Sequence, residues 1–311
     1  MSMKRFASMI VITGAIFAGW ETTRMASGVS IEPQRPSFTL KVATSQTTQA
    51  SVRGEGYIPK TLQKSNQPSE ASRNVFGRDQ RVPMTSSAYP WSAIGRIIEI
   101  DQDGGSMCTG NLIAKDLVVT NAHCVFGENG EPAQKISFEP NFANGASQDR
   151  ANVVSVVVGT DKPEQNRAKD WAILKLDQPL GEKYGWMEWA SEPVSTLTQL
   201  PKQFNLAGYS GDFPTKKTGG STAGVHVGCS IRGFEPALNL ATHDCDMTRG
   251  ASGGAIFTIS DTGMAVIVAL NDAENTSEGE YPAQFGQSTA NYAVLTQAWA
   301  GAAQQLRDQE Q

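Results

Sequence analysis

The sequence has few charged residues, only three histidines and no long block of lysine and arginine. Charged residues make up 18% of its 311 residues, whereas about 25% is usual. The balance is acidic, with 26 Lys+Arg against 31 Asp+Glu, which argues against a nucleic acid as the partner. The apolar share of 39% is sufficient for a hydrophobic core. This composition argues against a wholly disordered chain, a coiled coil and a polytopic membrane protein.

The N-terminus has the pattern of a secretory signal peptide. Lys4 and Arg5 precede an apolar run over residues 6–20 that only small residues interrupt. A positive start followed by about 7–15 apolar residues is typical of such a signal, and the run is shorter than the about 20 residues of a membrane span. We therefore predict a signal peptide within residues 1–27, removed from a secreted or periplasmic protein that keeps no membrane attachment. An uncleaved N-terminal anchor is the alternative.

Residues 28–74 differ in composition from the rest of the chain. They are rich in Ser, Thr, Gln and Pro and show no sustained helical or strand period. Residues 20–74 carry seven Lys+Arg and four Asp+Glu, a net charge of +3, whereas residues 75–311 carry 17 and 27, a net charge of −10. Two interpretations stay open. The segment is either a solvated linker, the common meaning of such composition, or a pro-segment lying on the acidic body.

The body of the chain is a succession of short apolar or alternating stretches of four to eight residues, separated by Gly, Asn, Asp and Pro. This pattern predicts an all-β sandwich or barrel. Residues 291–306 instead show a helical period of apolar residues, so we expect one C-terminal amphipathic helix that packs on the body. The expected strands are 93–100, 111–113, 117–120, 153–158, 171–176, 204–207, 224–231, 254–259 and 264–270.

Four cysteines form two neighbouring pairs, and the members of each pair are 16 residues apart. In an exported chain an even number of cysteines suggests disulfides, and four cysteines allow three connectivities. The local pairing, Cys108 with Cys124 and Cys229 with Cys245, is the simplest of these. A zinc site is the competing interpretation, but no pair has the spacing of two to four residues that such sites use. We therefore predict structural disulfides and no metal.

Residues 250–254, Gly-Ala-Ser-Gly-Gly, have the pattern of a nucleophile loop. A serine hydroxyl needs a base to take its proton, and the developing oxyanion needs backbone N–H donors. Glycines beside Ser252 allow the tight turn that exposes such donors. The pattern also fits the nucleophile elbow of α/β-hydrolases, in which the histidine follows the serine. Because every histidine precedes Ser252, only the order His, Asp, Ser is available.

His123 is the best candidate for the base. It directly follows the apolar strand expected at residues 117–120 and adjoins Cys124, so a disulfide would hold it in place. His226 lies within an alternating strand, where we expect its side chain on one face. His243 lies nine residues before the serine, and we expect it in a surface loop.

The third member of a triad should lie between His123 and Ser252 and should be buried enough to orient the imidazole. Asp170 fits this requirement, because it begins the apolar stretch 170–176. A carboxylate in that position is either a turn residue or a buried group with a partner, and the presence of His123 and Ser252 favours the second. The other acidic residues considered lie in polar, turn-like settings and look solvated; they are Asp161, Asp177 and Asp212.

Taken together, these motifs resemble those of the trypsin-like serine proteases, in the same order. The matching stretches are 108–110 and 120–124 around the histidine, 170–174 at the aspartate and 250–254 at the serine. Stretches 185–186, 207–212 and 245–246 further resemble the bacterial glutamyl-endopeptidase branch. The resemblance covers about residues 75–300. It implies two six-stranded antiparallel β-barrels, at 75–195 and 196–290, with the active site between them and a C-terminal helix and tail at 291–311.

The resemblance also implies a mechanism and its residues. Ser252 attacks the peptide carbonyl, His123 accepts its proton, and Asp170 orients the imidazole. Backbone N–H groups of Gly250 and Ser252 form the oxyanion hole. The chain is then a secreted, monomeric serine endopeptidase acting on proteins or peptides, with no cofactor. The expected specificity pocket contains Asp246, Met247, Leu270 and Asn271.

Two departures from the family bear on activation and specificity. Ala251 stands where digestive trypsins have an Asp that pairs with the new N-terminal amine, so that activation route is not expected. The bacterial branch often begins at a Val after Asn, which predicts processing between Asn74 and Val75.

Glutamate-selecting members have a histidine after the serine and this chain has none, so a strict glutamate preference is not expected. Asp246 lies where trypsins have their pocket acid, with a structural hydrogen-bonding role as the alternative.

Two other functions remain to be weighed. A protease fold that has lost catalysis would be a binding module, since fold does not fix function, although this sequence keeps all three triad residues. An esterase would use the same triad. Labelling of Ser252 and a peptide cleavage profile would separate these functions.

Overall fold

The computed structural model describes residues 35–44, 52–62, 79–102, 104–127, 129–274, 285–286 and 289–309. The predicted signal peptide and the predicted cleavage point between Asn74 and Val75 lie outside these residues. In the part of the chain described, no helix is long and apolar enough to span a membrane.

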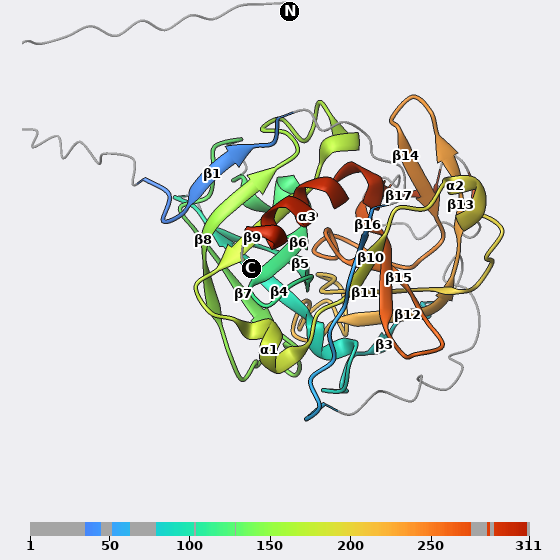
Figure 1. The fold of residues 1–311 in the computed structure, drawn as a ribbon, viewed down its shortest axis with the longest axis horizontal. Helices are drawn as coiled ribbons and strands as arrows, with labels where there is room; N and C mark the ends of the chain where they lie inside the picture. Colours follow the sequence, from blue (N-terminus) through green and yellow to red (C-terminus); the bar gives the residue numbers. More distant parts are fainter. Residues whose placement is uncertain are drawn as a thin grey trace, which may run out of the picture. The chain divides into compact units, whose positions relative to one another are not determined.

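The first barrel is a closed antiparallel sheet (Figure 1). Among the described residues its strands follow the order β8-β7-β4-β5-β6-β9, and β9 pairs back onto β8. Buried residues alternate along β8 at Ala151 and Val153 and again at Val156 and Val158, as expected for a strand with one face on a core, and a register shift between Val153 and Ser155 separates the two pairs. The strands are β4 (Ile94–Ile100), β5 (Gly105–Leu112), β6 (Leu117–Thr120), β7 (Lys135–Pro140), β8 (Ala151–Val158) and β9 (Ala172–Leu176).

The second barrel follows the path β13-β14-β17-β16-β15-β11-β12 within the described chain. Only Ser230 separates β12 from β13, so one bent segment supplies both ends of this path and turns the sheet back on itself. The predicted all-β fold is confirmed, with six strands in the first barrel; this path of the second sheet has seven strands and not six, because the break at Ser230 divides one segment into β12 and β13. The strands are β11 (Phe204–Gly208), β12 (Gly224–Cys229), β13 (Ile231–Glu235), β14 (Leu240–His243), β15 (Ala255–Ile259), β16 (Ala265–Glu274) and β17 (Asn291–Leu295).

Short elements connect the barrels and extend the second sheet. Strand β3 (Val82–Pro83) pairs with β12, and β10 (Glu188–Ala190) runs parallel to β16. Two brief helices, α1 (Leu180–Tyr184) and α2 (Val194–Leu197), flank β10. The 3₁₀ turns are η1 (Trp91–Ala93), η2 (Ala122–Val125), η3 (Arg167–Lys169) and η4 (Thr296–Ala298).

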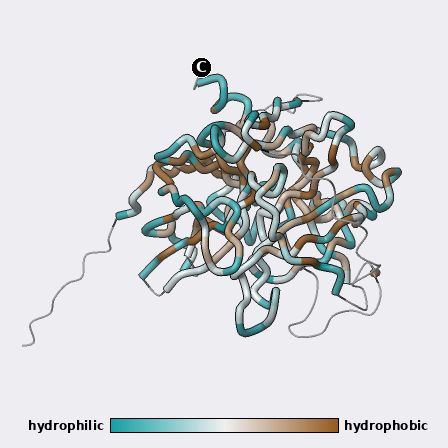
Figure 2. Tube along the Cα trace, turned by 90° about the horizontal axis from the view of Figure 1, so that it is seen from below, coloured by the Kyte–Doolittle hydropathy of each residue, from teal (hydrophilic) through white to brown (hydrophobic). Residues whose placement is uncertain are grey.

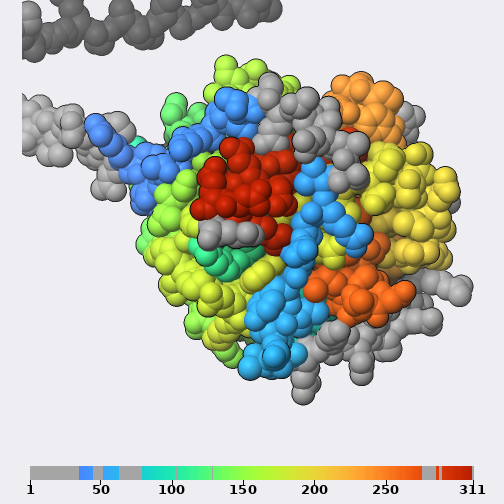
Figure 3. All heavy atoms as spheres, in the orientation of Figure 1, coloured from blue at the N-terminus to red at the C-terminus, as the bar shows by residue number. Residues whose placement is uncertain are grey.

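Two parts of the segment 28–74 pair with strands of the barrels. Strand β1 (Thr39–Val42) pairs in parallel with β8, and β2 (Arg53–Gly54) pairs antiparallel with β10. We call residues 35–44 and 52–62 the N-terminal strap. In Figure 3 its residues, in blue, lie on the surface beside the red C-terminal helix. This packing favours a segment that lies on the body over a solvated linker.

The C-terminal helix is shorter than predicted. Asn291–Leu295 forms strand β17 between β14 and β16, and the helix α3 covers only Ala300–Asp308. The prediction of a helix from residue 291 is therefore wrong, because pairing with two neighbouring strands overrides a helix-compatible pattern. The packing of this segment on the body is as expected. Trp299 is fully buried, with its ring centroid 5.9 Å from that of Trp189.

Apolar segments gather inside the body, and the loops and the end of α3 are hydrophilic (Figure 2). Both predicted disulfides are confirmed: Cys108 is bonded to Cys124, and Cys229 to Cys245. The first bridge joins β5 to η2 in the first barrel, and the second joins the end of β12 to the segment that follows β14.

Replacing Cys108 and Cys124 together by serine is expected to lower the free energy of unfolding by about 3 kcal/mol, because the bridge closes a loop of about 15 residues in the unfolded chain. Urea unfolding at pH 7 measures the loss. The matched control replaces Cys229 and Cys245, which close a loop of the same length and should cost the same. An unchanged urea midpoint in either double variant would contradict this expectation.

Candidate active site

His123 lies in the short 3₁₀ turn η2 that follows strand β6 and contains the disulfide-bonded Cys124. Strand β6 ends at Thr120, η2 begins at Ala122, and the bonded Cys124 fixes the turn from the other side. Ala122 and Cys124 are buried, whereas 29% of the His123 side chain is exposed. The fold therefore holds the backbone of His123 rigidly and presents its ring to the solvent side.

Asp170 lies between η3 and β9 and is 3% exposed. Its Oδ2 is 2.7 Å from Nδ1 of His123, and its Oδ1 accepts the backbone N–H of His123 at 2.9 Å. Asn121 holds the same segment by donating to the carbonyl of Asp170 at 2.7 Å. Because a carboxylate can only accept, Nδ1 of the ring carries the proton and Nε2 keeps its lone pair for use as a base.

The charges of this pair strengthen one another. Burial alone would lower the pKa of His123, but the negative charge of Asp170 and its hydrogen bond outweigh burial and raise that pKa above 6.5. Burial alone would raise the pKa of Asp170, but the His123 ring holds it below its ordinary value. The site therefore favours an imidazolium next to a carboxylate, the state a general base reaches after taking up a proton.

The serine loop requires its glycines. Gly250 has φ of +96° and Gly253 has φ of +80°, a backbone conformation that other residues rarely adopt. A Cβ at Gly253 would also overlap with Thr120 and Thr109 of the first barrel. The positive φ values at Gly250 and Gly253 therefore explain why glycine occupies these two positions of the loop.

Strand β5 of the first barrel holds the serine loop of the second. Thr109 N donates to the carbonyl of Ser252 at 2.8 Å, and Thr109 Oγ1 donates to the carbonyl of Gly250 at 3.0 Å. Asn111 Nδ2 donates to the carbonyl of Gly253 at 2.7 Å. These bonds use only carbonyl groups of the loop, so they do not engage the N–H groups of Gly250 and Ser252 that the predicted oxyanion hole requires.

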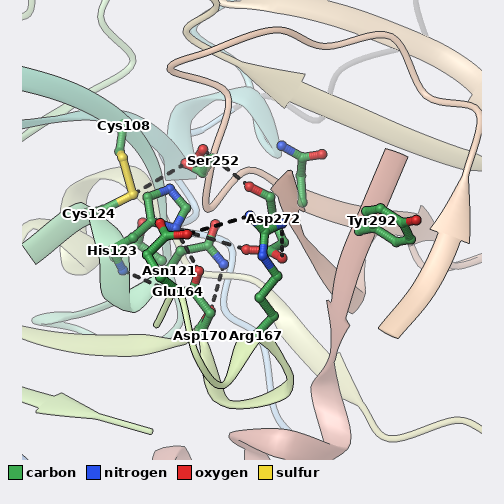
Figure 4. Close-up of polar contacts among 12 residues, drawn as sticks. Cys108, Asn121, His123, Cys124, Glu164, Arg167, Asp170, Ser252, Asp272 and Tyr292 are labelled. Atoms are coloured by element: carbon green, nitrogen blue, oxygen red, sulfur yellow. Dashed lines mark hydrogen bonds and ion pairs between the residues drawn. A yellow bond between two sulfur atoms is a disulfide. The ribbon is translucent and has the colours of Figure 1, made fainter. Parts of the chain in front are cut away.

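His123, Asp170 and Ser252 line one cleft of about 200 Å³ between the barrels. The Ser252 hydroxyl donates to the carbonyl of Asp272 at 3.4 Å, and Figure 4 shows His123 and Asp170 on one side of Asp272 and Ser252 on another. The structure thus brings the three predicted residues together. The cleft is also lined by Glu164, Arg167, Met247, Arg249, Asp272, Ala273 and Glu274.

The four predicted pocket residues are placed differently. Met247 lines the cleft, whereas Asp246, Leu270 and Asn271 are buried and are not among the lining residues. Asp246 accepts the N–H of Gln80 at 3.2 Å, and its own N–H donates to Nδ1 of His226 at 2.8 Å. These bonds favour the structural role of Asp246.

Asn271 has a structural contact of its own. Its Nδ2 donates to the carbonyl of Ala251 at 3.0 Å, and Gly253 N donates to its carbonyl at 2.9 Å. Asn271 therefore holds the serine loop through hydrogen bonds to the residues on either side of Ser252.

Two expectations about polar residues are wrong. His243 is fully buried on β14 and is not in a surface loop. Its Nδ1 accepts the N–H of Cys245 at 3.2 Å, and its Nε2 lies 3.3 Å from the carbonyl of Tyr292. Asp212 is mostly buried, with 17% of its side chain exposed, because it accepts two hydrogen bonds of 2.9 Å from the buried guanidinium of Arg81. Strand pairing and an ion pair across the chain account for these burials, and neither is visible in local composition.

The buried His243 predicts a pH dependence of stability. Burial lowers its pKa to about 4, below the ordinary 6.5, so the folded state resists protonation that the unfolded state accepts. The associated stability is fully present above pH 6.5 and is lost as the pH falls toward 4, by about 3 kcal/mol. Urea unfolding of the wild type and of His243→Gln between pH 7 and 4 measures it. The variant should show the shallower pH dependence, and equal slopes would contradict the assignment.

Sequence reasoning missed Asp272, which ends the apolar part of β16. Its side chain is only 2% exposed, with Oδ1 4.0 Å from Nδ1 of His123 and Oδ2 3.8 Å from Arg167. The available signal was an acidic residue two positions after the apolar run 265–270, whereas Asp170 directly precedes an apolar run. Among the described residues, donor atoms of His123, Asp170 and Asp272 lie within 4.8 Å of one another, a spacing that a metal ion could use, although two of them are already hydrogen-bonded together.

Solved structures share this fold at low sequence identity. A Glu endopeptidase in complex with MPD superposes with a TM-score of 0.57 at 23% identity, over 73% of this chain and 96% of that chain. The thermostable serine protease AL20, from an extremophilic microorganism, gives a TM-score of 0.52 at 18% identity, over 69% and 98%. These similarities support a chymotrypsin-like fold.

Sequence relatives are distant. Serine protease 23 of Rattus norvegicus is 24% identical over 234 residues, 66% of this chain and 56% of that protein, so the chain spans about half the length of that relative. A Bacillus subtilis protein named extracellular metalloprotease is 25% identical over 234 residues, 72% of this chain and 69% of that protein. The family model for the trypsin-like peptidase domain matches residues 108–266, half of the chain, and this stretch contains His123, Asp170 and Ser252. The chain therefore belongs to the trypsin-like peptidase domain family.

Proposed function

We propose that the protein is a secreted serine endopeptidase in which Ser252, His123 and Asp170 form the catalytic triad. The observation that carries the proposal is the 2.7 Å contact between Nδ1 of His123 and the buried carboxylate of Asp170, in one cleft with Ser252. This contact fixes the tautomer that leaves Nε2 free to accept a proton.

The proposed reaction passes through an acyl-enzyme. The Ser252 hydroxyl first turns from the carbonyl of Asp272 toward Nε2 of His123, a rearrangement common when substrate binds. As Oγ bonds to the peptide carbonyl carbon, its proton passes to His123, which then gives it to the leaving amine as the C–N bond breaks. Water attacks the ester by the same route and releases the acid and Ser252.

The oxyanion formed in each step needs donors. In the proposal these are the backbone N–H groups of Gly250 and Ser252, within a loop whose carbonyl groups are held by β5. A loop fixed in advance stabilises developing charge without reorganisation, which is typically worth more than about 2.7 kcal/mol for each donor.

A fluorophosphonate probe tests the nucleophile directly. We expect the probe to label the processed wild type and not Ser252→Ala. Labelling with no peptide cleavage but with ester hydrolysis would favour an esterase, and a folded wild type that takes no label would favour a non-catalytic binding module. A chelator should leave the labelling of Ser252 and the activity unchanged, because the proposed steps use no metal, and loss of both in a protein that keeps its fold would contradict this expectation.

Export and processing belong to the same proposal. We propose removal of a signal within residues 1–27 and cleavage between Asn74 and Val75, outside the described residues. The two disulfides support an oxidising compartment. Mass and N-terminal sequencing of the secreted protein test this, and a mature start well inside the body would refute it.

A further inference from the structure

Two carboxyl groups meet beside His123. The side chains of Asp170 and Asp272 are 4% and 2% exposed, and a carboxylate oxygen of each lies within 4.8 Å of the other and of a ring nitrogen of His123. Two ionised carboxylates this close together and this deeply buried repel each other, which favours a proton on one of them. The hydrogen-bond donors around the pair then decide which group carries it.

The surrounding donors identify the carrier. Asp170 accepts two hydrogen bonds from His123, at 2.7 and 2.9 Å, which compensate a negative charge. Asp272 Oδ2 is buried without a hydrogen-bond partner, and Arg167 lies 3.8 Å away, beyond hydrogen-bond distance. Arg167 is itself shared with Glu164 at 3.8 Å. The negative charge is therefore more stable on Asp170, and the proton on Asp272.

The electrostatics agree with this arrangement. Burial, followed by repulsion from Asp170, raises the pKa of Asp272 well above its ordinary value, although His123 and Arg167 act in the opposite direction. The pKa of Asp170 is lowered by His123 despite burial.

We propose that Asp272 is a neutral carboxylic acid that donates a hydrogen bond to Asp170 and so positions the carboxylate that orients His123. Asp272 is a positioning residue, since it acts on the reaction only through Asp170. The inference rests on the proposed function for its catalytic meaning, whereas the protonation of Asp272 is a property of the fold. A neutral Asp272 also leaves one negative charge, not two, next to His123.

The variants Asp272→Asn and Asp272→Leu separate the two parts of the proposal. Asn is neutral and keeps an N–H donor, so we expect kcat near that of the wild type and an unmoved acid limb of the pH profile of kcat/KM. Leu has a similar volume and no donor, so Asp170 loses its support and kcat should fall by about 10²-fold with KM little changed. If Asp272 were ionised, Asn would remove a negative charge next to His123 and shift the acid limb to lower pH.

A spectroscopic measurement tests the proton without activity. In a Ser252→Ala background at pH 7, infrared spectra should show the carbonyl stretch of a protonated carboxyl group, absent after Asp272→Asn and retained in the control Asp161→Asn, whose carboxylate is exposed. An unchanged spectrum after Asp272→Asn, or a lowered acid limb in that variant, would overturn the inference and leave the proposed function intact. If Asp272 were protonated but the protein had no peptidase activity, the proposed function would be wrong and the protonation of Asp272 would stand.

Discussion

Replacing Ser252 by alanine is expected to lower kcat for peptide hydrolysis by about 10⁶-fold, and His123→Ala should cost as much, as in subtilisin. The physical reason is that attack and proton transfer are one event, so neither residue retains useful chemistry without the other. The double variant should therefore be no slower than either single variant. A fluorogenic peptide assay measures all three, with fluorophosphonate titration counting active sites in the wild type and absorbance giving the protein concentration of the variants.

Controls separate chemistry from folding in this experiment. Ser260→Ala changes a serine in the turn between β15 and β16, outside the cleft, and should leave kcat unchanged. The Ser252→Ala protein should also keep the urea midpoint of the wild type, since the hydroxyl makes only a long 3.4 Å bond. A Ser252→Ala protein that still cleaves the peptide at more than a thousandth of the wild-type rate would reject the assignment of the nucleophile.

The residues of the candidate triad could be predicted because short local patterns specify them. Gly250 and Gly253 occur where φ is positive, so the glycines around Ser252 indicate a tight loop in the sequence. His123 and Asp170 each adjoin an apolar strand, and strands are readable from composition. The order of the motifs along the chain then limits the fold, since a chymotrypsin-like site requires the histidine before the serine.

What the sequence did not indicate depends on contacts between distant segments. Asp272 lies 102 positions after Asp170, and only the closure of both barrels brings their carboxyl groups together. His243 looked like a loop residue because its neighbours are polar, yet pairing of β14 with β17 buries it. Asn291–Leu295 fits a helical period and an extended strand about equally, and the free edges of β14 and β16 decide between them.

The N-terminal strap shows the same dependence on distant partners and leads to the second large expected effect. Phe38 is 7% exposed and belongs to the main hydrophobic cluster, and the backbone of residues 37–43 bonds to β8 and to Gln134, which directly precedes β7. The backbone of Gly54 packs directly against Trp189, so any Cβ at this position would overlap the indole ring. The strap is therefore packed as a core element even though it precedes the predicted cleavage point.

Further contacts extend along the strap. Tyr57 and Trp186 exchange two backbone hydrogen bonds of 3.0 Å, and their ring centroids are 4.5 Å apart. Arg307 of α3 donates to the carbonyl of Glu55. Because these bonds are distributed over both barrels and the C-terminal helix, cutting the chain behind the strap should remove none of them.

A protein cut between residues 62 and 79 is thus expected to keep its strap as a second, non-covalent chain. The test inserts a site for a specific protease there, in a Ser252→Ala background, and applies the cut protein to gel filtration. Both fragments should elute together and separate only in denaturant. Phe38→Ala combined with Gly54→Val should release the strap, since loss of a buried phenylalanine alone costs about 3–5 kcal/mol. Lys41→Ala, an exposed change on the same strand, should not release it. A wild-type strap that elutes separately under native conditions would mean that it is a detachable pro-segment, and that contacts with the sheets do not suffice to hold it once the covalent link is gone.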